Sequence, residues 1–139
     1  MMYGYARART AQGAISPCRF VKPGNVPFTG LQAAAETDAI IGVSLEFDNP
    51  QAGQRFDFAV LGPAKIELGA TVADGDLLTS DSEGRGITAT RHTHTENIAA
   101  AYAQNATTAA APVARVGAMA LSAGVVGEFI DIIVLPILG

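Results

Sequence analysis

Residues 55–68 read RFDFAVLGPAKIEL. In an extended chain Phe56 and Phe58 lie on one face while Arg55 and Asp57 lie on the other, which is the alternation of a half-buried antiparallel strand. Residues 64–68 alternate in the same way after the Gly-Pro pair at positions 62 and 63. We therefore expect two strands here, separated by a turn.

Short apolar runs recur along the chain between seven prolines and fifteen glycines, and they predict further strands at residues 39–46, 76–79, 86–89, 113–121 and 127–135. The last run is apolar on both faces except at Glu128 and Asp131, so it should lie centrally in a sheet. Residues 81–84, Asp-Ser-Glu-Gly, form a hairpin signal with glycine where a positive φ is needed. The predicted class is all-β, a small antiparallel β-sandwich or barrel of jelly-roll-like type. The predicted core residues are Phe56, Phe58, Ile130 and Ile132.

The chain also contains an internal similarity. Residues 53–61, GQRFDFAVL, align with residues 127–135, GEFIDIIVL, at a constant offset. Two copies do not make a solenoid, which usually needs three or more. They suit two sheets built from similar hairpins, and the alternative is a chance likeness between apolar strands.

Prolines at positions 17, 23 and 27 interrupt the first thirty residues and remove donors that a central strand needs. We therefore predict an extended N-terminal arm over residues 1–30 and one domain over residues 31–139. Arginine and aromatic residues are enriched at protein interfaces. We predict that the arm makes its contacts through Tyr3, Tyr5, Arg7, Arg9, Arg19 and Phe20. The alternative is an edge strand and turn of the domain itself.

Residues 91–112 are predicted to be an insertion in the domain. Its Ala-rich part, residues 98–112, is predicted as either a short helix or a loop, because polar residues interrupt the alanines. Just before it, His92, His94 and Glu96 share one face of an extended chain, as metal ligands would. Three ligands at this spacing are a weak signal, and a polar linker explains them equally well, so we predict no metal site.

Catalytic chemistry finds little support in the residue pattern. Asp74, Asp76 and Asp81 lie within eight residues, but their spacing does not match a calcium loop, and aspartate commonly bonds its own backbone in turns. The two histidines lie together in a polar stretch, and the sequence contains no Gly-x-Ser-x-Gly motif. We predict a protein that is not an enzyme and needs no cofactor.

Composition indicates a surface that is partly covered by other proteins. Hydrophobic residues make up 49% of the 139 residues and charged residues 16%, against about 25% in typical soluble domains. We therefore expect a homo-oligomer. The net charge of −4 argues against nucleic acid as a partner, and the longest apolar run, residues 132–138, is too short to span a membrane. The single cysteine, Cys18, is expected to be buried and unreactive.

Two resemblances bear on function. Residues 72–79, VADGDLLT, resemble the hairpin of biotinyl and lipoyl carrier domains, but the lysine that those domains modify is missing. Residues 58–85, together with the strand at 116–120 and the strand at 129–134, are similar to the capsid cement or head decoration proteins of tailed bacteriophages. The likeness spans roughly residues 40–135, while residues 1–30 and 91–112 have no clear counterpart in that family.

Membership in the cement family would imply a structural virion protein. Such a protein is made in the host cytoplasm, binds the major capsid protein on the outer surface of the head as a dimer or trimer, and reinforces contacts between shell subunits. The alternatives are a phage surface or tail adhesin, disfavoured by the absence of Trp, or an enzyme of unrecognised type.

Overall fold

The computed structural model of the chain describes residues 5–47, 49–89 and 115–137, and every regular element in these ranges is a β-strand. The strands are β1 (Tyr5–Ala11), β2 (Phe20–Pro23), β3 (Thr29–Gln32), β4 (Gly42–Ser44), β5 (Arg55–Glu67), β6 (Leu77–Ser80), β7 (Gly86–Thr88), β8 (Val116–Ala120) and β9 (Phe129–Ile137). The all-β prediction is confirmed. The insertion at residues 91–112, with its helix-or-loop alternative, lies outside the described residues.

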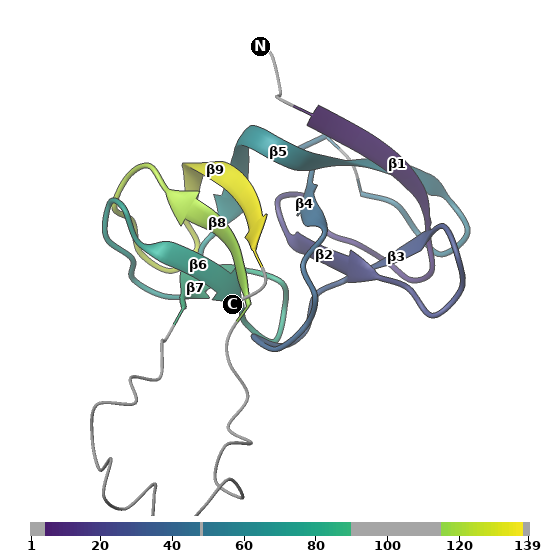
Figure 1. Ribbon diagram of the computed structural model, residues 1–139, viewed down its shortest axis with the longest axis horizontal. Helices are drawn as coiled ribbons and strands as arrows, with labels where there is room; N and C mark the ends of the chain where they lie inside the picture. The colour runs from purple at the N-terminus through teal and green to yellow at the C-terminus, as the bar shows by residue number, and fades with distance from the viewer. Residues whose placement is uncertain (1–4, 48, 90–114, 138–139) are drawn as a thin grey trace, which may run out of the picture.

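The first half of the molecule is a closed barrel of five strands. The strands follow the order β1-β3-β2-β4-β5, and a second pairing of β1 with β5 closes the ring. All these pairings are antiparallel except that of β1 with β3, which is parallel. Figure 1 shows β1, β2 and β3 on one side of the molecule, with β4 and β5 leading toward the other half.

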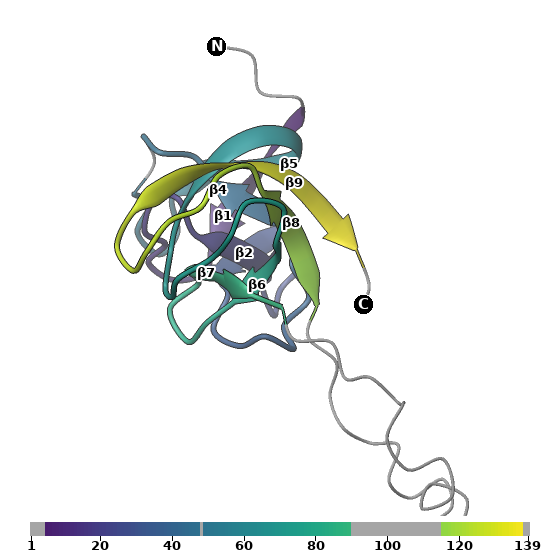
Figure 2. The same ribbon diagram turned by 90° about the vertical axis from the view of Figure 1, so that its left-hand side faces the viewer.

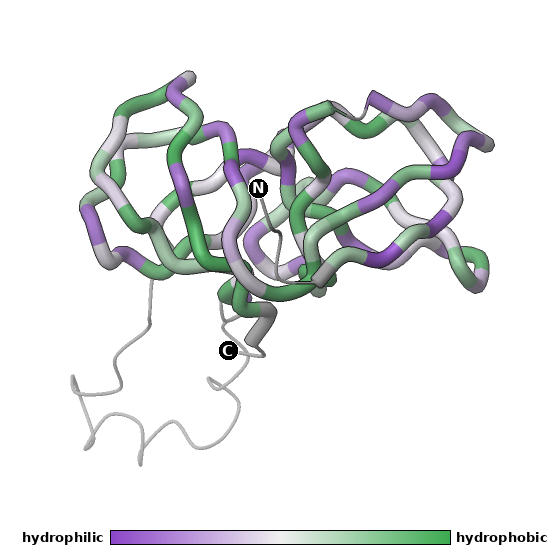
Figure 3. The backbone as a smooth tube through the Cα atoms, turned by 90° about the horizontal axis from the view of Figure 1, so that it is seen from above, coloured by the Kyte–Doolittle hydropathy of each residue, from purple (hydrophilic) through white to green (hydrophobic). Residues whose placement is uncertain are grey.

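The second half begins on the same long strand. Beyond residue 61, β5 leaves β1 and pairs with β9, and the sheet continues through β8 and β6 to β7. One isolated bridge between Leu68 and Gly86 brings β7 back to the end of β5, so this half curls into an incomplete second ring. Seen from above, the two halves lie side by side (Figure 3).

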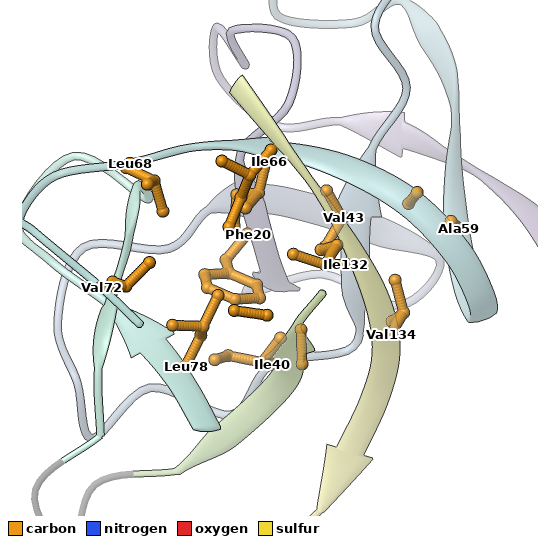
Figure 4. Packing of buried hydrophobic residues seen from close by; sticks show 14 of the residues in the cluster. Phe20, Ile40, Val43, Ala59, Ile66, Leu68, Val72, Leu78, Ile132 and Val134 are labelled. Atoms are coloured by element: carbon orange, nitrogen blue, oxygen red, sulfur yellow. The ribbon is translucent and has the colours of Figure 1, made fainter. Parts of the chain in front are cut away.

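The molecule has two hydrophobic clusters, one inside the barrel and one shared by the two halves, and β2 contributes to both. Val21 packs inside the barrel with Ile15, Phe56 and Phe58. Phe20, on the opposite face of the same strand, packs into the larger cluster between the halves, where Figure 4 shows it among Ile66, Leu78 and Ile132. The four predicted core residues, Phe56, Phe58, Ile130 and Ile132, are all at most 6% exposed, so their predicted burial is confirmed.

The predicted N-terminal arm is wrong for residues 5–30. These residues supply β1, β2 and part of β3, three of the five barrel strands, and Ala11, Ile15 and Phe20 are completely or almost completely buried. The prolines do not prevent this, because Pro17 and Pro27 lie in turns and Pro23 is the last residue of β2. The prediction treated every proline as a break in the domain, whereas these prolines mark the ends of very short strands.

The two strands expected on either side of Gly62 are one continuous strand. Gly62 has a φ of 100°, yet it pairs with Val134, and Pro63 pairs with Ile133. The proline is accommodated because it lies beyond Leu61, the last residue of β5 that pairs with β1. From that point only β9 pairs with β5, so one edge of the strand requires no donor.

One type of turn precedes β5, β6 and β9. In each turn the amide of the fourth residue donates to the carbonyl of the first, 3.0–3.1 Å away, and the third residue is a glycine with a φ of 87–89°. The side chain of the fourth residue then accepts a 2.8 Å bond from the first amide, which explains the polar residues Gln54, Asp76 and Glu128. The predicted likeness of residues 53–61 to 127–135 thus corresponds to equivalent turn-and-strand units, and residues 73–80 add a third.

Candidate interaction surfaces

Of the six residues predicted to form an interface, the four whose side chains the structure describes do not gather on one surface. Tyr3 and the side chain of Tyr5 lie outside the described part of the chain, and Arg7 is exposed on β1. Arg9 donates from Nη1 to the carbonyl of Thr29, 3.0 Å away, and so ties β1 to β3. Phe20 is completely buried in the larger cluster and is not available to a partner.

The side chain of Arg19 also makes contacts within the fold. Its Nη2 lies 2.9 Å from the carboxylate of Glu67, and its Nη1 donates to the carbonyl of Glu83 at 2.7 Å. The side chains of Arg19 and Glu67 are 14% and 20% exposed. The guanidinium therefore joins the start of β2 to the end of β5 and to the β6–β7 turn, which places this residue in the structural framework.

Cys18 precedes Arg19 and is 2% exposed, as expected. Burial of the thiol, reinforced by the nearby carboxylate of Glu46, raises its pKa from 9.0 to about 11. A thiol with so high a pKa contains almost no thiolate at neutral pH, and the thiolate is the reactive form. Burial of the side chain and the raised pKa of the thiol both agree with the expectation that Cys18 is unreactive.

The carboxylates of residues 74–81 act mainly within their turns, as predicted. Asp76 accepts from the amide of Ala73, and Asp81 accepts from the amides of Glu83 and Arg85 at 2.8 and 2.9 Å. Asp74 is exposed at its turn. Across residues 5–47, 49–89 and 115–137 no group of three or more acidic, His or Cys residues is arranged to hold a metal ion, while His92, His94 and Glu96 lie outside these ranges.

The loop between β2 and β3 presents an unusual aromatic side chain. Phe28 is 84% exposed and has a φ of 65°, a left-handed conformation that non-glycine residues rarely adopt. Its neighbour Val26 is 55% exposed. We call residues 24–29 the Phe28 loop. Burying a phenylalanine is normally favourable, so a folded loop that directs one into solvent suggests a site of contact with another molecule.

Hydrogen bonds from the neighbouring strand hold the Phe28 loop in place. Thr10 donates its amide to the carbonyl of Phe28 at 3.1 Å, and the side chain of Gln12 accepts from the amide of Asn25 at 2.7 Å. Within the loop, the amide of Gly24 donates to the carbonyl of Thr29 at 3.1 Å. A side chain at Gly24 would collide with Thr29 and Gln12, so this close approach requires glycine. The loop is preorganised, which reduces the entropy lost on binding.

A second apolar surface lies on the side of β9 that faces away from the core. Ile130, Ile132 and Val134 point inward, so Phe129, Asp131 and Ile133 point outward. Pairing across the sheet adds Pro63 and Lys65 from β5 and Met119 from β8, and it places Glu67, which is bound by Arg19, opposite Phe129. We call the surface formed by Pro63, Lys65, Met119, Phe129, Asp131 and Ile133 the outer β9 face. In Figure 2, β8 and β9 lie on the side of the molecule nearest the viewer.

Sequence reasoning missed both surfaces. Phe28 is a single aromatic between Pro27 and Thr29, and nothing in its local sequence indicates a positive φ or exposure. The sequence of β9 does contain a signal, because its two apolar faces predict a central strand. This prediction is confirmed, since β9 lies between β5 and β8. The residue pattern does not reveal that one of these faces remains open in a single chain.

Within the part of the chain that the structure describes, no helix is long and apolar enough to span a membrane.

Comparison with known proteins relates the fold to a phage component. Neither known protein families nor curated protein sequences contain a match to the chain. Among solved structures, the chain is similar to the N base of the head fiber protein gp8.5 of bacteriophage phi29, in a crystal structure. The TM-score is 0.59, with 13% sequence identity over 94% of this chain and 93% of the other. This likeness establishes that the two chains share a fold.

Proposed function

We propose that the protein is a non-enzymatic structural component of a bacteriophage head, which attaches to the outer surface of the shell as a cement or decoration protein. The observation that carries the proposal is the fold shared, over almost the whole of both chains, with a base of a phage head fiber. The resemblance of residues 40–135 to capsid cement proteins points independently to the same part of a virion. Its partner would be the major capsid protein.

The Phe28 loop is the surface best suited to contact with the shell. It presents Phe28 and Val26 from a backbone fixed by hydrogen bonds, so few degrees of freedom are lost on binding. An exposed aromatic side chain that enters a pocket is a typical hot spot of protein interfaces. Several such contacts, one from each copy on a repetitive shell, would add through avidity.

Binding to purified shells that lack the protein tests this proposal. The chain should cosediment with shells at saturating occupancy, and Phe28→Ser should weaken binding by roughly 30-fold, the loss that corresponds to a hot spot of about 2 kcal/mol. Phe47→Ser is the matched control, because Phe47 is also 84% exposed but lies in a different loop. Failure of the unmodified chain to bind shells would contradict the proposal, and equal binding by Phe28→Ser would contradict the role of the loop.

The structural neighbour favours a second candidate, the base of a head fiber. The two roles differ in their effect on the shell. A cement protein should raise the temperature or osmotic stress at which shells break, because it bridges subunits. A fiber base should bind with little effect on shell strength. Measuring shell rupture with and without bound protein separates them.

A further inference from the structure

The outer β9 face is an apolar surface that the described strands leave open, and it carries one exposed ion pair. Phe129 is 54% exposed, Pro63 is exposed opposite Ile133 on the far side of the Lys65–Asp131 pair, and Met119 and Ile133 are half-buried. Leu121, which continues β8 next to Asp131, is 43% exposed and extends the same surface. A soluble chain rarely leaves such a sheet face uncovered without a partner.

Two oppositely charged residues lie in the middle of this surface. Lys65 and Asp131 are paired residues of β5 and β9, and their side chains are 44% and 66% exposed. The Nζ and Oδ1 atoms are 3.8 Å apart, against 2.9 Å for the pair of Arg19 with Glu67. An exposed pair at this distance contributes little to folding. Both charged groups therefore retain capacity for a stronger interaction with a partner.

We propose that the outer β9 face binds the same face of a second copy of this chain. Glu67 on this face is held by Arg19 at 2.9 Å, so Lys65 and Asp131 are the charges on it that are paired only weakly. One positive and one negative group on an otherwise largely apolar face make that face complementary to itself after a twofold rotation. Lys65 of one copy then meets Asp131 of the other, twice, while the apolar side chains of the two copies bury one another. The low overall charge, 16% of residues, agrees with a chain that covers part of its surface by self-association.

Charge reversal tests the proposed pairing in solution, without shells, so its outcome is separate from that of the shell-binding proposal. The unmodified chain should sediment as a dimer at micromolar concentration. Lys65→Glu and Asp131→Lys should each raise the dimer dissociation constant at least tenfold, because each change sets like charges against one another across the twofold axis. Phe129→Ser should weaken the dimer as well.

Mixing the two single variants provides the decisive measurement. Lys65→Glu and Asp131→Lys together should form a heterodimer about as tight as the unmodified dimer, because both contacts across the interface again join opposite charges. Arg55→Glu, a charge reversal at the other end of β5, should leave the dimer unchanged. Thermal melting within a few degrees of the unmodified chain would show that each variant folds. A monomeric unmodified chain, an assembly of more than two copies, or no recovery on mixing would overturn the proposal.

Discussion

At the scale of single residues, Cys18 links stability to pH. The folded state raises the pKa of the thiol from 9.0 to about 11, chiefly by removing it from water. The neutral thiol is thus favoured in the folded state, and this contribution is complete below pH 9 and is lost as the pH rises toward 11. Urea unfolding at pH 8, 9.5 and 10.5 should show falling stability, and Cys18→Ala should make the decrease smaller. If the free energy of unfolding of Cys18→Ala falls as steeply with pH as that of the unmodified chain, the pH dependence belongs to other groups.

Ser44 is the second residue whose role can be measured directly. Its buried hydroxyl accepts from the amide of Arg19 at 3.0 Å and donates to the carbonyl of Ser16 at 2.8 Å, so it fixes the turn that leads into β2. Ser44→Ala leaves both backbone groups without that partner and should lower the free energy of unfolding by about 1–3 kcal/mol. Ser82→Ala, at an exposed position, should change it by less than about 0.5 kcal/mol. Equal effects would show that the turn does not depend on Ser44.

At the scale of elements, β5 organises both halves of the molecule. Phe58 is 2% exposed inside the barrel, with its ring centroid 5.5 Å from that of Phe56. Phe58→Ala should therefore lower the free energy of unfolding by about 3–5 kcal/mol, measured by denaturant titration. Phe47→Ala, which removes the same atoms from an exposed side chain, should have little effect. A decrease of the free energy of unfolding well below this range for Phe58→Ala would mean that the barrel interior can collapse around the missing ring.

The elements that sequence reasoning identified correctly are those with a strong local signal. Alternation along residues 55–60 and 64–68 depends only on neighbours in the chain, and it placed Phe56 and Phe58 inside. The strand predicted at residues 39–46 contains β4, but the barrel strands β2 and β3, with four residues each, are too short to show a period. Their pairing is decided by contacts between distant segments, such as Phe20 with Val43, that a local pattern does not encode.

The interaction surfaces were less predictable for a related reason. Apolar residues are expected inside, so hydrophobicity alone cannot distinguish Phe28, which is 84% exposed, from Phe20, which is completely buried. Arginines were expected at an interface, yet Arg9 and Arg19 bond to Thr29, Glu67 and Glu83 of the same chain. In both cases the residues that surround the side chain in the folded structure decide whether it is available to a partner.

At the scale of the whole molecule, closure of the barrel makes its N-terminal strand indispensable. β1 pairs with β5 along residues 5–10 and with β3 at residues 10 and 11, so it is the strand that completes the ring. It also supplies the Thr10 amide that bonds to the Phe28 loop, and it leads directly into Gln12, whose side chain accepts a second bond from that loop. Loss of β1 should therefore disturb both the fold and the surface proposed to contact the shell.

Two truncations test this dependence. Deleting residues 1–11 removes β1, exposes the edge of β5 and opens the core around Phe56 and Phe58, so cooperative thermal unfolding should be lost or shifted down by tens of degrees. Deleting residues 1–4, which precede β1, should leave the melting temperature nearly unchanged. An arm that only tethers the domain would give the same melting temperature for both truncations. A stable protein after deletion of residues 1–11 would therefore show that four strands suffice for the barrel and that β1 serves attachment instead.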